Sequence, residues 1–194
     1  MTNFITMTDS YKASHFLQYP PGAERVFSYI EARKGGAHSE TVFFGLQMFL
    51  NKLAKMRVTN ANIRAAEGLL KAHGEPFNLE GWSRIVDVHN GYLPLIIRAV
   101  PEGSVVPCGN ALVTVENTDD QLPWLTSYIE TSLLRAVWYP TTVATVSWSI
   151  KKVIKKFLEE TCDDPESVLP FRLHDFGARG VSSAESAEIG GVAL

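Results

Sequence analysis

The residues best suited to chemistry lie in the stretch HDFGARGVSS, residues 174–183. This stretch follows a predicted short strand at residues 171–175 and leads into a predicted helix, a place where open α/β proteins bind ligands. Its two glycines allow close approach of the backbone to a ligand, and the free N–H groups of a helix start attract an anion. Arg179 adds a planar cation suited to phosphate, and Phe176 adds a flat aromatic face. The pattern fits a site for a flat ring and a phosphate, and it fits an ordinary corner with a buried phenylalanine equally well.

A second stretch, TDSYK at residues 8–12, places an acid, an aromatic ring and a base at a predicted helix start. Thr8 or Asp9 could cap a short helix that carries Tyr11 and His15. A ligand site and a capped amphipathic helix with a half-buried Tyr11 both account for this pattern. Taken alone, the pattern favours the helix.

The elements that must position these residues are predicted to be helices in some parts of the chain and strands in others. Apolar residues at three- and four-residue spacing predict helices over residues 42–53, 63–70, 82–88, 121–139 and 143–158. Runs rich in β-branched and aromatic residues predict strands at residues 25–33, 93–100, 104–106 and 111–117. The last three of these runs are separated by Pro, Gly and Asn, which is typical of a compact antiparallel β unit.

The end of the chain suggests that more sequence follows. The apolar pattern of the last predicted helix continues to Leu194 without a polar tail. The predicted strand at residues 171–175 would also need a parallel partner, reached by a crossover, and no further strand is predicted after it. We therefore expect the front part of a longer α/β protein.

Composition and charge exclude several classes of protein. The chain has 194 residues and a net charge of −3, so binding to nucleic acid or to an anionic membrane surface is not expected. Cys108 and Cys162 are isolated, so the sequence predicts neither a metal site nor a disulfide framework. There is no apolar run of about 18 residues and no targeting segment at the N-terminus. We expect a soluble, cytoplasmic protein that holds any phosphate with a few placed groups.

Seven segments of the chain, in order, resemble the nicotinamide phosphoribosyltransferase family. They are TDSYKASHFLQYPP, FSYIEAR, ETVFFGLQMFLNK, RAVPEGSVVPCGNALVTVENTD, WLTSYIET, WYPTTVAT and HDFGARGVSS. The resemblance extends over almost the whole chain but covers only the N-terminal part of the family, whose members are substantially longer. Ala178 stands where the vertebrate type has tyrosine, and the connection at residues 34–40 is shorter.

The resemblance implies an activity and a set of binding residues. Family members transfer a phosphoribosyl group from phosphoribosyl pyrophosphate to nicotinamide, giving nicotinamide mononucleotide and pyrophosphate in NAD salvage. They are homodimers whose active site lies at the subunit interface. By motif match, Phe176 stacks on one face of the pyridine ring and the partner subunit's Tyr11 on the other. Asp9 lies in the same pocket wall as Tyr11, Arg179 holds phosphate, and Arg33 reaches phosphate from the partner subunit.

The resemblance also implies a fold. Residues 1–120 would form an α+β N-terminal domain that contains the small antiparallel β unit. Residues 121–194 would begin an α/β barrel-like phosphoribosyltransferase domain that is incomplete here. The family uses Mg²⁺ and ATP, and the residues that mainly bind them, like the catalytic residues, would lie beyond Leu194. No catalytic residue is therefore assigned within this chain, and we expect the 194-residue chain alone to be inactive.

Two other functions stay open at this point. The chain could be a truncated, non-catalytic interaction module, because the phosphoribosyl and ATP machinery is absent from it. It could also belong to a nicotinate phosphoribosyltransferase, because the residue that distinguishes amide from carboxylate lies downstream in the family.

Overall fold

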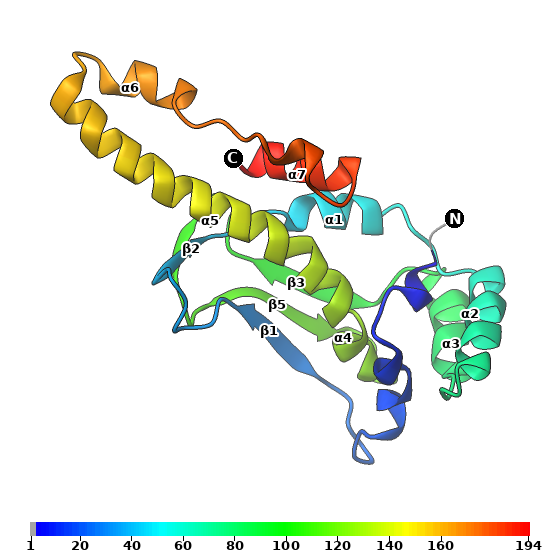
Figure 1. Cartoon of the computed structure of the whole chain (residues 1–194). Helices are drawn as coiled ribbons and strands as arrows, with labels where there is room; N and C mark the ends of the chain where they lie inside the picture. The colour runs from blue at the N-terminus through cyan, green and yellow to red at the C-terminus, as the bar shows by residue number, and fades with distance from the viewer. Residues whose placement is uncertain (1–2) are drawn as a thin grey trace. The chain divides into compact units, whose positions relative to one another are not determined.

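The computed structural model describes residues 3–194, which divide into two compact units of three chain segments each (Figure 1). Unit 1 contains the residues up to Ile30, then Gln47–Ala99 and Ala111–Arg135. Unit 2 contains Glu31–Leu46, Val100–Asn110 and Ala136–Leu194. These units interleave along the sequence, so their limits do not coincide with residue 120. The domain boundary expected there for the family stays a prediction.

The sheet of unit 1 has three strands in the order β1-β5-β3. β1 is Phe27–Glu31, β3 is Leu95–Ala99, and the central strand β5 is Ala111–Asn117. β3 and β5 pair antiparallel, from Leu95 opposite Asn117 to Ala99 opposite Val113. The predicted strands at residues 25–33, 93–100 and 111–117 are therefore confirmed; the first two are shorter than expected, and the third has the expected bounds.

Helices complete unit 1 and supply its core. They are η1 (Phe4–Thr6), η2 (Ser10–Leu17), most of α1 (Leu46–Leu53), α2 (Asn60–Ala72), α3 (Leu79–His89) and α4 (Trp124–Tyr128). The buried indole of Trp82 lies edge-on to the rings of Trp124 and Tyr128, with ring centroids 4.9 and 5.0 Å away. Edge-to-face aromatic pairs of this kind add stability beyond the apolar area that they bury.

Unit 2 contains a two-stranded antiparallel sheet of β2 (Glu40–Val42) and β4 (Val105–Pro107). Two expectations are corrected here. The helix expected over residues 42–53 begins at Leu46, because Val42 pairs with Val105 in this sheet. The run at residues 104–106 likewise pairs with β2 and does not join β3 and β5.

A single long helix, α5 (Glu130–Thr161), replaces the two helices expected to meet at Pro140. Proline has no N–H to donate, so α5 lacks one backbone hydrogen bond at Pro140 and nevertheless continues. Gly45 lies against this point: a Cβ on residue 45 would lie 2.6 Å from the carbonyl oxygen of Ala136, the group that Pro140 cannot hydrogen-bond. Gly45 also has a φ of +107°, which a glycine adopts at little cost.

Two threonine hydroxyls of α5 hold the backbone of β2 and of the residues after it. The Thr145 hydroxyl accepts a hydrogen bond from the Val42 amide at 2.9 Å and lies 2.9 Å from the Thr41 hydroxyl. One turn earlier, the Thr141 hydroxyl accepts from the Phe44 amide and donates to its carbonyl. These bonds satisfy backbone groups that no strand partner reaches.

The residues after α5 form short helices: α6 (Pro165–Val168), η3 (Leu169–Phe171), η4 (Gly177–Arg179) and α7 (Ala184–Ala193). The strand expected at residues 171–175 is wrong. Strand geometry requires a ladder of backbone hydrogen bonds to a neighbouring strand, and local bonds take its place here. His174 Nε2 lies 3.1 Å from the Phe171 carbonyl oxygen, and the Gly177 amide donates to the Asp175 carboxylate. The last helix is confirmed, with Ser183 capping its start.

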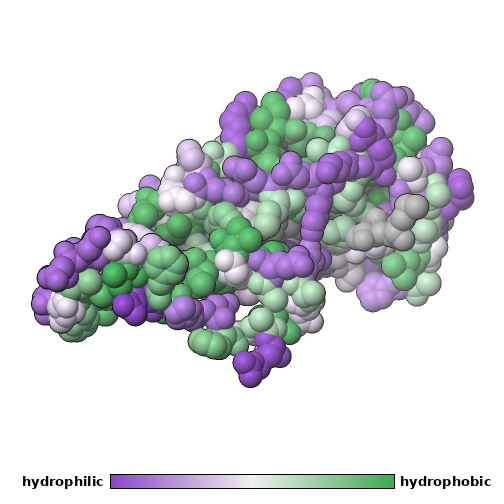
Figure 2. Space-filling model, turned by 90° about the horizontal axis from the view of Figure 1, so that it is seen from above, coloured by the Kyte–Doolittle hydropathy of each residue, from purple (hydrophilic) through white to green (hydrophobic). Residues whose placement is uncertain are grey.

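Apolar side chains reach the surface at several places, as Figure 2 shows for one face. On α5 they include Val146, Ile150, Val153 and Phe157, which follow one another at three- and four-residue spacing. None of the helices in residues 3–194 combines the length and the apolar character that a membrane span requires. The described residues form a mixed α/β structure with two small sheets, in which β3 pairs antiparallel with β5 and β2 with β4.

Candidate functional site

Tyr11 lies in unit 1 on η2, with 53% of its surface exposed. Its ring centroid is 5.3 Å from that of His15, and the ammonium of Lys12 lies 5.4 Å from the ring. The short helix expected here is therefore present, but it is a 3₁₀ helix. A phenol ring with half of its surface free can stack on a flat ligand.

Asp9 is the N-cap residue of η2, yet its side chain makes no capping hydrogen bond. Its carboxylate instead accepts a hydrogen bond from the hydroxyl of Thr131, at 2.6 Å, at the start of α5. Asp9 and Tyr11 are thus two residues apart at one exposed edge of unit 1, and their place in one pocket wall stays a prediction. Of the two residues expected to cap the helix, Asp9 occupies the N-cap position, but its carboxylate contacts Thr131 and does not cap.

Phe176 and Arg179 lie in unit 2, immediately before and at the end of η4. Phe176 is 76% exposed and Arg179 is exposed, so one loop presents an aromatic face and a guanidinium to solvent. The Gly177 amide donates to the Asp175 carboxylate at 2.6 Å, a local turn that shapes this loop. The alternative of a corner with a buried phenylalanine does not describe this structure, since Phe176 is exposed.

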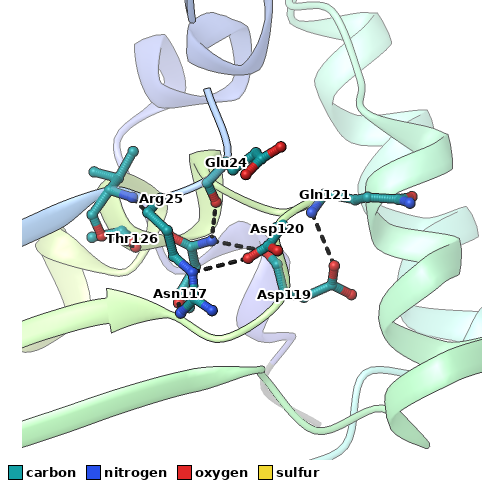
Figure 3. A network of polar contacts seen from close by, with 8 residues as sticks. Glu24, Arg25, Asn117, Asp119, Asp120, Gln121 and Thr126 are labelled. Atoms are coloured by element: carbon teal, nitrogen blue, oxygen red, sulfur yellow. Dashed lines mark hydrogen bonds and ion pairs between the residues drawn. The ribbon is translucent and has the colours of Figure 1, made fainter. Parts of the chain in front are cut away.

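Arg33 also belongs to unit 2, two residues after the end of β1, and its side chain is exposed. The path of the chain into β1 is fixed by Asn117, which is fully buried (Figure 3). The Asn117 amide oxygen accepts from the Val26 amide at 2.8 Å, and its nitrogen donates to the Glu24 carbonyl at 2.8 Å. The Asn117 side chain therefore hydrogen-bonds the backbone of the segment that leads into β1 and on toward Arg33.

The titratable groups with strongly shifted pKa values serve the framework of unit 1. Burial raises the pKa of the Tyr128 phenol, whose hydroxyl donates to the Ile5 carbonyl at 2.7 Å. Burial also acts to raise the pKa of Asp119, but hydrogen bonds from Arg84, His89 and the Gln121 amide hold it well below its usual range. Both groups stabilise the packing around α4.

Comparisons with known proteins show what this chain is similar to. A family model described as the nicotinamide phosphoribosyltransferase N-terminal domain matches residues 3–97. The chain is 58% identical, over its whole length, to a nicotinamide phosphoribosyltransferase of Xanthomonas campestris pv. campestris, of which it covers 41%. It is 32% identical over 98% of its length to a nicotinamide phosphoribosyltransferase of Acinetobacter baylyi, of which it covers 40%. Along its length the chain is thus similar to the N-terminal part of nicotinamide phosphoribosyltransferases.

The match to the family concerns its N-terminal part. The chain spans about two fifths of the length of these relatives. Among solved structures, human nicotinic acid phosphoribosyltransferase is similar, with a TM-score of 0.54 and 24% identity over 76% of this chain and 28% of that one. At that identity the likeness concerns the fold alone.

The binding of Mg²⁺ and ATP that the resemblance implies stays a prediction. Across residues 3–194 no group of three or more His, Cys, Asp or Glu side chains is arranged to hold a metal ion. Mg²⁺ is often held by one or two carboxylates together with substrate phosphates and waters.

Reasoning from sequence missed two residues that contact Lys12 and Asp9, the neighbours of Tyr11 in the chain. Glu130 forms an ion pair with Lys12, and Thr131 holds Asp9, although both are about 120 positions away in the chain. Neither residue stands in a local motif with the groups that it contacts. The only sequence signal is that both lie in WLTSYIET, one of the segments that resemble the family.

Proposed function

We propose that this chain forms the nicotinamide-binding N-terminal part of an enzyme that makes nicotinamide mononucleotide. The reaction transfers the phosphoribosyl group of phosphoribosyl pyrophosphate to nicotinamide and releases pyrophosphate, a step of pyridine nucleotide biosynthesis. One observation carries the proposal: the chain is 58% identical, along its whole length, to a nicotinamide phosphoribosyltransferase. The exposure of Tyr11 and Phe176 supports it, since a flat ligand needs free aromatic faces.

In this proposal the residues of the chain bind and orient the pyridine ring. Phe176 stacks on one face of the ring and the partner subunit's Tyr11 on the other, so that two copies of the chain complete one site. Arg179 and the partner subunit's Arg33 bind phosphate oxygens, for which a guanidinium is well shaped. Asp9 completes the wall beside Tyr11.

The reaction itself is a substitution at ribose C1. The bond from C1 to pyrophosphate oxygen breaks, pyrophosphate leaves with the electron pair, and the pyridine nitrogen forms the new bond to a C1 with oxocarbenium character. No protein nucleophile is required, so orientation of the ring and stabilisation of charge supply the catalysis. Fixing the ring between two aromatic side chains places its nitrogen toward C1 and removes part of the entropic cost of the encounter.

The proposal extends to features of the whole protein. It includes a homodimer in the cytoplasm, an α/β barrel-like catalytic domain beginning after residue 120, and Mg²⁺ and ATP bound mainly by residues outside this chain. The 194-residue chain alone would be inactive, because the residues that hold the phosphoribosyl group are not in it.

The test is an assay on the full-length product of the gene, with the 194-residue chain run beside it. Each is incubated with phosphoribosyl pyrophosphate, Mg²⁺ and either nicotinamide or nicotinate at equal concentration, and the mononucleotide and pyrophosphate formed are quantified. Equimolar nicotinamide mononucleotide and pyrophosphate, with nicotinamide preferred, would support the proposal. Preference for nicotinate would instead assign a nicotinate phosphoribosyltransferase.

The non-catalytic interaction module predicts a different result. It requires that no mononucleotide forms with either pyridine and that the chain associates with a catalytic homologue. Size-exclusion chromatography of the chain mixed with such a homologue would detect that association.

A further inference from the structure

We infer that Lys12 and Glu130 are positioning residues for the nicotinamide subsite, because their ion pair fixes η2 so that Tyr11 faces outward, ready to stack on the pyridine ring. The inference rests on the proposed function. It gives a role in substrate binding to a buried lysine for which the proposed chemistry has no other use.

The burial of Lys12 is the first observation. Only 3% of its surface is exposed, and its ammonium lies 2.5 Å from the carboxylate of Glu130. A buried ammonium is costly unless an anion compensates it, so Lys12 is held wherever Glu130 is held. Glu130 lies in the first turn of α5, where the free N–H groups of the helix favour a negative charge. The ion pair therefore joins η2 to the start of the longest helix in the chain.

The consequence for Tyr11 follows from the geometry of η2. In a 3₁₀ helix with three residues per turn, adjacent side chains point about 120° apart. Turning Lys12 inward to meet Glu130 thus turns its neighbour Tyr11 outward, where half of its surface is exposed. The Lys12 ammonium, 5.4 Å from the Tyr11 ring centroid, is also within the range of a cation–π contact. The ion pair fixes the rotation of η2 about its own axis, and with it the direction of the phenol ring.

η2 needs such an anchor because it is poorly stabilised by itself. It runs for eight residues, whereas 3₁₀ helices longer than three or four residues are uncommon, and it has no side-chain cap. Backbone and side-chain groups around the α4–α5 junction hold the segment before Tyr11 as well. The bonds run from the Thr8 hydroxyl to the Tyr128 carbonyl (3.1 Å), from the Thr131 hydroxyl to Asp9 (2.6 Å), and from the Ser132 hydroxyl to the Met7 carbonyl (2.9 Å). The Lys12–Glu130 pair is the contact of this set nearest to Tyr11 in sequence.

Kinetics can separate positioning from a merely structural role. An ion pair that only stabilised the fold would, when removed, lower the amount of active enzyme and leave the KM values of the remaining molecules unchanged. A pair that orients Tyr11 would instead raise the KM for nicotinamide and leave the KM for phosphoribosyl pyrophosphate unchanged.

The experiment uses the full-length enzyme carrying Lys12→Met, which keeps a long side chain and leaves Glu130 able to contact water. We expect the KM for nicotinamide to rise about three- to tenfold, the effect of having to order a loose aromatic side chain on binding. We expect kcat and the KM for phosphoribosyl pyrophosphate to stay within about twofold of wild type. Lys12→Arg, which keeps the charge, should recover most of the loss. The matched control is Lys71→Met, which removes an exposed ion pair with Glu67 on α2 and should change nothing.

A second variant covers the case in which Lys12→Met does not fold. Thr131→Val keeps the shape of the side chain and removes only the hydroxyl that donates to Asp9. It should raise the KM for nicotinamide by about two- to fourfold, because one of the contacts that order η2 is lost.

Tyr11→Ala separates failure of the inference from failure of the proposed function. If Tyr11→Ala raises the KM for nicotinamide while Lys12→Met and Thr131→Val leave it unchanged, the inference is wrong and the proposed site stands. The inference would also be wrong if Lys12→Met and Thr131→Val lowered kcat only in proportion to the amount of folded protein and left the KM for nicotinamide unchanged. If wild type does not use nicotinamide, or if Tyr11→Ala has no effect, the proposed function or its site is wrong and the inference falls with it.

Discussion

Nε2 of His89, at the end of α3, lies 2.7 Å from Oδ2 of Asp119, a buried carboxylate between β5 and α4. The same oxygen accepts a hydrogen bond from Nε of Arg84 at 2.7 Å, and the other carboxylate oxygen accepts from the Gln121 amide at 2.9 Å. These donors outweigh the opposing effect of burial and hold the pKa of Asp119 well below its ordinary value of 3.8. A charged hub therefore joins α3 to the turn that leads into α4.

This hub predicts how stability depends on pH. A carboxylate with a lowered pKa in the folded state contributes stability that is fully present above its unfolded pKa of 3.8 and is lost as the pH falls through the lower folded value. Asp119→Asn should therefore be clearly less stable than wild type at pH 7, and the difference should shrink below about pH 4. Urea unfolding of both proteins from pH 7 to pH 3 measures it. Asp120→Asn is the matched control, because its exposed ion pair with Arg25 should contribute at most about 1 kcal/mol. A difference from wild type that stays constant across this pH range would contradict the prediction.

Asn117→Ala should be among the more damaging single substitutions. It leaves the half-buried Val26 amide and the carbonyls of Glu24 and Asp119 without their side-chain partner (Figure 3). We expect a loss of about 2–4 kcal/mol in the free energy of unfolding, since buried polar groups without hydrogen bonds are costly. Asn110→Ala, which removes one exposed hydrogen bond in the turn before β5, should cost less than about 1 kcal/mol. Similar losses for the two variants would show that Asn117 does not have the role described.

Two glycine-to-alanine substitutions should have effects of opposite sign. At Gly45 a Cβ would lie 2.6 Å from the Ala136 carbonyl oxygen and the φ of +107° is strained for alanine, so we expect a loss of about 2–4 kcal/mol. At Gly68 in α2 nothing lies within 4 Å, so alanine should raise stability by about 0.5–1 kcal/mol through its helix propensity. Thermal unfolding of the two variants gives the comparison. A stable Gly45→Ala protein would mean that the residues before α1 do not pack against α5 at Pro140.

Phe176→Ala tests the assigned ring-binding residue in the full-length enzyme. Loss of one stacking face should raise the KM for nicotinamide by about three- to thirtyfold, because aromatic contacts contribute about 0.5–1.5 kcal/mol beyond the area they bury. Leu69→Ala is the control, since Leu69 is an exposed apolar residue on α2 that the proposed chemistry does not use. Steady-state kinetics with nicotinamide varied at saturating phosphoribosyl pyrophosphate would decide it, and unchanged kinetics for Phe176→Ala would remove that residue from the site.

Local sequence predicted most elements because their signals are local. The apolar spacing of α2 and α3 marks helices without reference to the rest of the chain. The β-branched run of β5, bounded by turn residues, marks a strand in the same way. The likeness to the family was also accessible at this level, because the identity of a motif does not depend on how it is folded.

The failures occurred where a distant partner decides the outcome. Pro140 predicts the end of a helix, yet α5 continues through it. Gly45, from a segment 95 residues earlier, lies against the Ala136 carbonyl, which Pro140 cannot hydrogen-bond. Residues 171–175 read as a strand, but strand geometry needs a neighbouring strand, and local turns form instead.

By itself, then, the sequence determined the helices and strands with local signals, the likeness to the family, and the candidate ligand-binding residues Tyr11, Asp9, Phe176, Arg179 and Arg33. Only the tertiary structure showed that Phe176 is exposed and that Thr131 rather than the helix start holds Asp9. It alone joined the buried ammonium of Lys12 to Glu130, 118 residues away. The physical reason is that burial and ion pairing depend on which segments meet in space, and a contact between distant segments leaves no periodic or local pattern along the chain.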